Sequence, residues 1–134
     1  MKIKATLIAL VVVFIMSLGY HANAGEVQAP LSTPELKQAL GLGKKTVVFF
    51  INPMGKPCQA QKEILLKLHQ DRAKKFNIAY VDATKPENQK AFYDYGIRGL
   101  PSLVLVDSSG KIAKVFSPGI QSYETLSQAL DSIK

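Results

Sequence analysis

The six-residue run from Thr46 to Ile51, TVVFFI, constrains the fold of this chain more than any other feature. After its first residue it is entirely apolar, and it is rich in β-branched and aromatic side chains. Such a run is typical of a strand buried on both faces, because a half-exposed strand would alternate apolar and polar residues. We therefore expect a central strand in a sheet that is covered on both sides.

The segments that follow and precede this strand predict alternating helices and strands. Apolar residues at helical spacing, capping residues and glycines mark the helices, and short β-branched runs mark the other strands. The expected order is a helix opened by Ser32 and Glu35 as a capping box and ended by Gly41 and Gly43, strand 46–51, helix 56–74, a second buried strand at 78–81, helix 86–95, strands 102–106 and 112–116 joined by a turn at Asp107-Ser108-Ser109-Gly110, and a final helix capped by Ser122.

This order predicts the fold class. A parallel βαβ unit, a helix, a β-hairpin and a closing helix together give a mixed central β-sheet sandwiched by helices, which is an α/β fold. The chain contains no internal repeat and no linker long enough to divide it. We expect one domain, residues 25–134.

Residues 1–24 are expected to form a signal peptide. Lys2 and Lys4 give a basic start, an almost wholly apolar run follows, and Ala22-Asn23-Ala24 matches a cleavage site. The apolar run is shorter than the roughly 17 to 25 residues of a membrane-spanning helix, so no stable membrane insertion is expected after cleavage. We expect a periplasmic protein, with an extracellular location as the alternative.

Charge and cysteine content exclude several function classes. The 17 Lys and Arg residues include both signal lysines, so the mature chain carries 15 against 10 acidic residues, or +5. The pairs Lys44-Lys45 and Lys74-Lys75 lack interleaved aromatic residues, so we expect a solvated surface and no nucleic acid partner. The single cysteine rules out an internal disulfide. The mature chain has only this cysteine and one histidine, His69, which give no metal-ligand cluster. We expect no metal and no cofactor.

The chain resembles the thioredoxin family over nearly all of residues 25–134. The resemblance implies a thioredoxin-like fold and a cis proline at Pro101 beside the active-site loop. The run from Tyr95 to Ser102, YGIRGLPS, is its most specific part. The other supporting features are the strand Val47-Val48-Phe49-Phe50, the loop Gly55-Lys56-Pro57-Cys58, the hairpin turn at Gly110, and Gly119.

Three positions depart from the family pattern. Gly55 stands where the family has its nucleophilic cysteine, and Met54 stands where many members have tryptophan. Phe49 stands where thioredoxin keeps a buried acid that assists proton transfer to the second cysteine. Because a C-x-x-C pair needs both sulfurs for its cycle, the normal dithiol cycle is not expected here.

The chemistry of Cys58 has two interpretations. At about 100° per residue, Leu65 lies only about 20° around the predicted helix from Cys58, so this sulfur should face inward and position 55 outward. The helix start and Lys56 favour a reactive thiolate, whereas burial beside leucines disfavours the thiolate and blocks access. Cys58 is therefore either a reactive single thiol or an inert buried one.

A partner surface is expected beside the loop. Met54 is either part of an adaptable surface with Ile97 and Leu100 or simply packed within its loop, and we favour loop packing. By the resemblance, the backbone of Leu100 next to Pro101 pairs with an extended partner peptide, a form of strand addition.

Two functions remain open. The first is thiol-disulfide exchange through Cys58, as a monothiol oxidoreductase that forms a mixed disulfide with a protein or small thiol. The loop residues Met54, Gly55, Lys56 and Pro57 would then shape the site, and Ile97, Leu100 and Pro101 would hold the partner. The alternative is a redox-inactive peptide-binding or assembly module. We expect a monomer, because an inward-facing thiol is poorly placed to link two chains.

Overall fold

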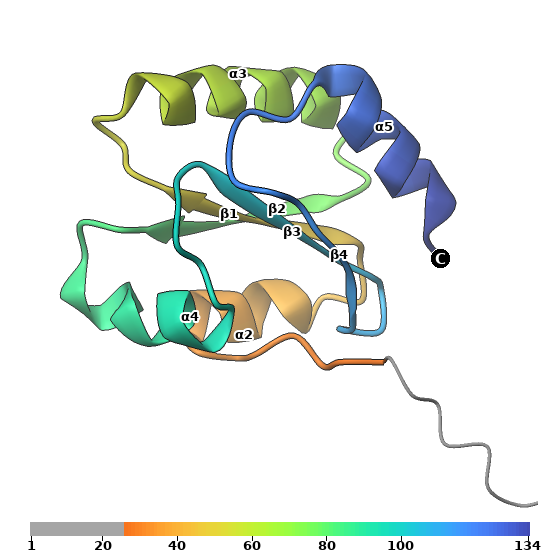
Figure 1. Cartoon of the computed structure of the whole chain (residues 1–134). Helices are drawn as coiled ribbons and strands as arrows, with labels where there is room; N and C mark the ends of the chain where they lie inside the picture. Colours follow the sequence, from red (N-terminus) through yellow and green to blue (C-terminus); the bar gives the residue numbers. More distant parts are fainter. Residues whose placement is uncertain (1–25) are drawn as a thin grey trace, which may run out of the picture.

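The computed structural model describes residues 26–134, and the predicted signal peptide lies outside the described residues. Figure 1 shows three layers, with α3 and α5 on one face of a sheet and α2 and α4 on the other, which confirms the α/β sandwich. The elements are α2 (Pro34–Leu40), β1 (Thr46–Ile51), α3 (Lys56–Asp71), β2 (Asn77–Asp82), the 3-10 helix η2 (Pro86–Asn88), α4 (Gln89–Asp94), β3 (Ser102–Val106), β4 (Ile112–Val115) and α5 (Tyr123–Ser132).

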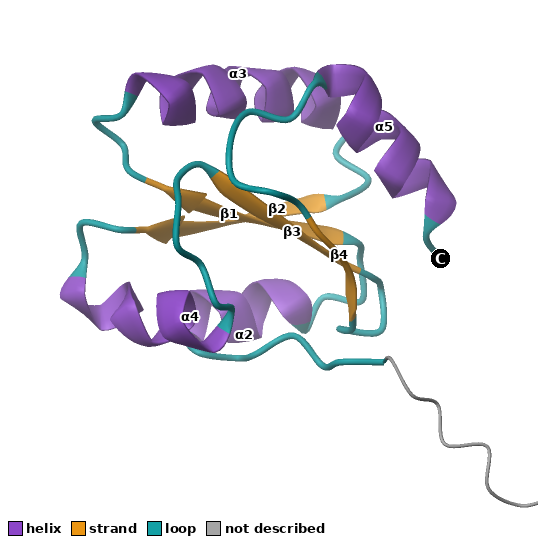
Figure 2. Ribbon diagram, in the orientation of Figure 1, coloured by secondary structure: helices purple, strands orange, loops and turns teal. Residues whose placement is uncertain are grey.

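The sheet has the strand order β2-β1-β3-β4. β1 runs parallel to β2, with Thr46 opposite Asn77, and antiparallel to β3, with Thr46 opposite Val106. β3 and β4 form the expected antiparallel hairpin. β1 is thus an internal strand, as its apolar run predicts, and Figure 2 shows helices above and below it.

The side chains of β1 enter two separate hydrophobic cores. Val47, Phe49 and Ile51 belong to the core under α3 and α5, which also contains Cys58. Val48 and Phe50 belong to the core over α2 and α4. All six residues of β1 are buried, because each face of the strand is covered by a helical layer.

Several predicted boundaries were wrong in detail. Thr33, not Ser32, caps α2, because its hydroxyl accepts a hydrogen bond from the Leu36 N–H at 3.1 Å. The Ser32 hydroxyl instead donates to Asp94.

α3 ends at Asp71 rather than 74, since Ala73 adopts a left-handed conformation with φ 52°. The predicted helix 86–95 is a 3-10 turn followed by α4, and β4 ends one residue before its predicted end.

β2 is an edge strand rather than a second fully buried one. Its side chains alternate in exposure, and Tyr80 is 40% exposed. The Asn77 N–H donates to the Lys45 C=O, and the Ala83 N–H donates to the Ile51 C=O, so both N–H groups point toward β1. Because backbone groups alternate in direction along a strand, Ile78 and Tyr80 turn their N–H and C=O groups away from β1.

No helix within residues 26–134 is long and apolar enough to cross a membrane.

Candidate functional site

The loop between β1 and α3 is organised by Asn52. Its side-chain oxygen accepts a hydrogen bond from the Met54 N–H at 3.0 Å, and its C=O accepts one from the Gly55 N–H at 2.9 Å. Gly55 is the N-cap of α3 in an extended conformation, and Pro57 suits the first turn of the helix. Asn52 thus bends the chain into the start of α3, and the sequence reasoning did not single it out.

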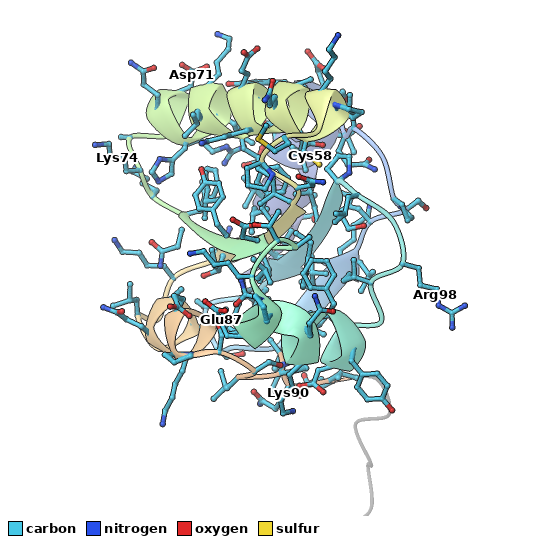
Figure 3. The ribbon with its side chains drawn as sticks, turned by 90° about the vertical axis from the view of Figure 1, so that its left-hand side faces the viewer. Cys58, Asp71, Lys74, Glu87, Lys90 and Arg98 are labelled. Atoms are coloured by element: carbon cyan, nitrogen blue, oxygen red, sulfur yellow. The ribbon has the colours of Figure 1, made fainter. Side chains whose placement is uncertain are left out.

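Cys58 lies in the first turn of α3 and points into the core. It is 2% exposed, and its Sγ accepts a hydrogen bond from the Asn52 N–H at 3.5 Å. Figure 3 shows it on the sheet side of α3, while Arg98 extends away from the protein. The inward orientation agrees with the helical spacing of Cys58 and Leu65, which share one core cluster.

Gly55 keeps the spacing of a disulfide pair although it has no side chain. A Cβ built on Gly55 would lie 3.8 Å from the Cβ of Cys58 and 3.6 Å from its Sγ. Disulfides have Cβ–Cβ distances of about 3.5 to 4.5 Å. The backbone therefore retains the geometry of a C-x-x-C loop from which the first sulfur is missing.

The peptide bond between Leu100 and Pro101 is cis, as the family resemblance implies. Two hydrogen bonds hold the segment: the Ser102 hydroxyl donates to the Gly99 C=O at 2.6 Å, and the Gly119 N–H donates to the Pro101 C=O at 2.9 Å. Pro101 itself is buried.

Leu100 packs the cis-proline segment against the core that contains Cys58. Its side chain is half-buried and packs against both hydrophobic cores, including the one that contains Cys58. Within residues 26–134, the Leu100 N–H and C=O make no backbone hydrogen bond. An extended peptide would therefore find a free donor and acceptor at this position.

The remaining predicted residues differ in exposure. Met54 is 84% exposed, so our preference for simple loop packing was wrong. Lys56 and Pro57 are exposed at the start of α3, and Ile97 is half-buried against the core over α2 and α4.

Phe49 fills the position of the family's buried acid with an aromatic contact. It is fully buried, on the same face of the sheet as Cys58, and its ring centroid lies 5.8 Å from that of Tyr80. The Lys62 ammonium sits 5.6 Å from the Tyr80 ring, and burial raises the pKa of Tyr80. A phenyl ring cannot carry a proton, so Phe49 gives Cys58 no proton-transfer assistance.

Gln61 is a second residue that the sequence reasoning missed. It is fully buried one turn after Cys58, and its Nε2 donates to the Gln121 C=O at 3.2 Å. The Gln121 N–H donates in return to the Gln61 Oε1 at 2.6 Å. A glutamine within the apolar spacing of Cys58, Leu65 and Leu68 was the available signal, because a polar residue at such a position needs a specific partner.

Among the described residues, no group of three or more His, Cys, Asp or Glu side chains is placed to hold a metal ion. The site consists of one sheltered thiol at a helix start, a free backbone edge at Leu100, and a neighbouring cis proline. This combination on an α/β sandwich defines a protein of thioredoxin-like architecture.

Comparison with known proteins agrees with this class. The model of the thioredoxin-like domain family matches residues 33–134. The match spans most of the chain, and the chain therefore belongs to the thioredoxin-like domain family. No curated protein matches it significantly.

Two solved structures share the fold. An uncharacterised thioredoxin-like protein from Clostridium perfringens has a TM-score of 0.61 at 24% identity, over 68% of this chain and 71% of its own. A malarial protein has a TM-score of 0.58 at 18% identity, over 67% of this chain and 97% of its own. At these identities the likeness extends to the fold alone.

Proposed function

We propose that this protein takes part in thiol-disulfide exchange through Cys58 as a single reactive sulfur. The observation that carries the proposal is the retained pair geometry, with a Cβ at position 55 falling 3.8 Å from that of Cys58. Because position 55 is glycine, the space that the side chain of a first cysteine would occupy stays open. A partner's sulfur could approach Cys58 from that side, because Gly55 presents only backbone there.

The exchange would proceed in two balanced steps. The Cys58 thiolate attacks one sulfur of a partner disulfide, forming a mixed disulfide and releasing the partner's other sulfur as a thiolate. A small external thiolate then attacks the partner's sulfur in the mixed disulfide, which releases Cys58 as a thiolate. A new disulfide joins the partner to the small thiol. The site needs no metal or cofactor for either step.

The partner would be held as an extended peptide. The unpaired N–H and C=O of Leu100 support backbone pairing, beside Pro101 and the half-buried Ile97. Met54, which is 84% exposed, adds an adaptable apolar contact at the rim. The protein would act as a monomer on this partner.

The chemistry would take place outside the cytoplasm. The basic start, apolar run and cleavage motif within residues 1–24 support export, to the periplasm or, alternatively, the extracellular space. An oxidising compartment supplies the disulfides that the first step consumes.

Glutathione disulfide is a direct probe of this function. Residues 25–134 are incubated with it and analysed by mass spectrometry, with the Cys58→Ser variant as the control. One glutathione per chain, removed by dithiothreitol and absent from Cys58→Ser, is the expected result. The proposal fails if native Cys58 resists glutathione disulfide and a thiol-labelling reagent, while the urea-unfolded chain reacts with both.

A non-covalent binding module is the second candidate, favoured by two observations. Cys58 is 2% exposed and Phe49 offers no proton-transfer group. This candidate predicts that Cys58→Ser keeps partner binding, whereas Met54→Asp and Leu100→Pro weaken it. Binding that depends wholly on the sulfur would exclude it. The matched measurement is capture of extended peptides by the three variants under reducing conditions.

A further inference from the structure

Two lysine pairs that lie thirty residues apart in the sequence meet at one end of the molecule. Lys44 and Lys45 precede β1, and Lys74 and Lys75 follow α3. The Asn77 N–H donates to the Lys45 C=O at 2.8 Å, which places the chain before β2 beside the chain before β1. Lys44, Lys45, Lys75 and Arg72 line a hollow of about 320 Å³. We call Lys44, Lys45, Arg72, Lys74 and Lys75 the basic pole.

The basic pole carries most of the excess charge of the described chain. Residues 26–134 contain 15 Lys and Arg and 10 Asp and Glu, and hence a net charge of +5. Of the acidic residues, Asp131 pairs with a cation of the pole, Arg72, at 2.9 Å. The five cations of the basic pole and this one acid sum to +4. The remaining described residues therefore carry a net charge of only +1.

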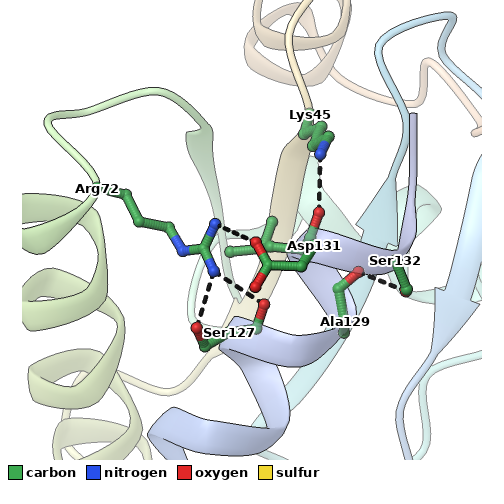
Figure 4. A network of polar contacts seen from close by, with 7 residues as sticks. Lys45, Arg72, Ser127, Ala129, Asp131 and Ser132 are labelled. Carbon is green, nitrogen blue, oxygen red and sulfur yellow. Dashed lines mark hydrogen bonds and ion pairs between the residues drawn. The ribbon is translucent and has the colours of Figure 1, made fainter.

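Part of the basic pole is fixed and part is free. Arg72 also donates to Ser127, and the Lys45 ammonium donates to the Leu130 C=O at 2.7 Å, an arrangement that Figure 4 shows around α5. Lys44, Lys74 and Lys75 are exposed and make no ion pair with a described residue. Figure 3 shows Lys74 reaching outward from the turn after α3.

Exposed apolar side chains lie next to the basic pole. Leu42 lies between Gly41 and Gly43, two residues before Lys44, and is 60% exposed. It lines a neighbouring hollow together with Leu66, which is 46% exposed. Exposed leucines beside free lysines are typical of surfaces that lie on lipid, where cations meet headgroups and apolar side chains enter the acyl boundary.

We infer that the basic pole docks this domain on an anionic lipid surface. Lys44, Lys74 and Lys75 pair with phosphate headgroups, and Leu42 enters the boundary beneath them. Charge complementarity selects an anionic partner, and the adjoining Leu42 selects lipid over an acidic polypeptide. α3 has 16 residues, which is about 24 Å at 1.5 Å per residue, so its Cys58 end is held away from the lipid.

Vesicle co-sedimentation tests this inference. The protein is residues 25–134, which contain every helix and strand that the structure describes. The vesicles are phosphatidylcholine alone or mixed in equal parts with phosphatidylglycerol. We expect binding to the mixed vesicles only, and its loss at high salt. Equal binding to both vesicle types, or none to the mixed ones at low salt, would overturn the inference.

Paired variants locate the surface. The double change Lys44→Gln and Lys74→Gln should weaken partitioning by about 25-fold, because each basic residue near an anionic surface strengthens binding about fivefold. Lys85→Gln with Lys114→Gln removes the same charge elsewhere and should weaken it far less. Equal losses in the two double variants would contradict a localised surface.

A variant of Leu42 distinguishes a lipid partner from an acidic polypeptide partner. Leu42→Ser should weaken vesicle binding without changing the net charge, and circular dichroism would establish that each variant is folded. If Leu42→Ser binds as the unchanged domain does and polyglutamate displaces the vesicles at equal charge concentration, the pole fits an acidic polypeptide and the lipid inference is wrong.

Discussion

Gln61 and Gln121 form a reciprocal pair in which one buried side chain holds both polar groups of a distant backbone residue. The same loop places the Gly119 N–H on the Pro101 C=O. The turn of α3 that follows Cys58 is thereby connected to the cis-proline segment through residues 119–121. The Cys58 region and the cis-proline segment are therefore both hydrogen-bonded to the same loop, residues 119–121.

Gln61→Ala should lower the free energy of unfolding by about 1 to 3 kcal/mol, because it leaves the partners of a buried amide unsatisfied. Urea denaturation measures the loss. The matched control is Gln59→Ala, since Gln59 is exposed and its side chain bonds only the Pro53 C=O among the described residues. We expect the control to stay within about 0.5 kcal/mol. Similar losses in both variants would argue against the supporting role of Gln61.

Gly55→Cys should create a disulfide with Cys58 without a backbone change. The built Cβ lies 3.8 Å from that of Cys58, and Gly55 has an extended conformation that any residue adopts. After mild oxidation, thiol titration should find no free thiol in the native variant, and two after reduction. Two reactive thiols that persist in the oxidised sample would show that the loop geometry is different. Gly55→Cys with Cys58→Ser is the control that retains one thiol.

Phe49→Ala should destabilise the domain by about 3 to 5 kcal/mol, the usual cost of removing a buried phenyl ring. Phe49 is fully buried and contacts Tyr80. Tyr93→Ala removes an aromatic ring that is 86% exposed and should change little. Urea unfolding of both variants makes the comparison, and a small loss for Phe49→Ala would mean that the core re-forms around the change.

Asp107 should make the stability of the β3–β4 turn depend on pH. Burial acts to raise the pKa of Asp107, but hydrogen bonds from the Ser109 hydroxyl and from the N–H groups of Lys111 and Ser109 outweigh it, and the pKa is lowered. A carboxyl with a lowered folded-state pKa stabilises above its unfolded value of about 3.9 and loses this contribution as pH falls through the folded value.

Asp107→Asn should therefore flatten the fall in stability below about pH 4, since the amide does not titrate there. Urea unfolding at a series of pH values measures the slope. Glu63→Gln, on the exposed face of α3, is the control, because the Glu63 side chain makes no hydrogen bond or ion pair with a described residue. An unchanged slope in Asp107→Asn would assign the acid sensitivity to other carboxyls.

The strand Thr46–Ile51 and the cap at Ser122 could be predicted because their causes are local. A continuous apolar run requires cover on both faces, and the Ser122 hydroxyl accepts from the Thr125 N–H three residues later. The cis bond at Pro101 followed from the family motif rather than from the residues alone.

Features that depend on distant partners could not be predicted. Ser32 and Thr33 are both good caps, and the bond from Ser32 to Asp94, 62 residues away, leaves Thr33 to cap α2. Tyr80 is partly exposed because β2 lies at the edge of the sheet within residues 26–134, and the apolar run 78–81 does not reveal this position. The partner of Gln61 lies 60 residues away in the sequence, so its burial had no local sign beyond its helical spacing.

Because β2 lies at the sheet edge, its backbone amides should fall into two groups with different rates of hydrogen–deuterium exchange. Ala79 and Val81 turn their N–H groups toward β1, in phase with the bonded Asn77 and Ala83, and should exchange only when the sheet opens. Ile78 and Tyr80 turn theirs outward and should exchange quickly. A single strand would then show slow and fast amides in strict alternation, and a molecule that pairs with this edge would slow only the second set.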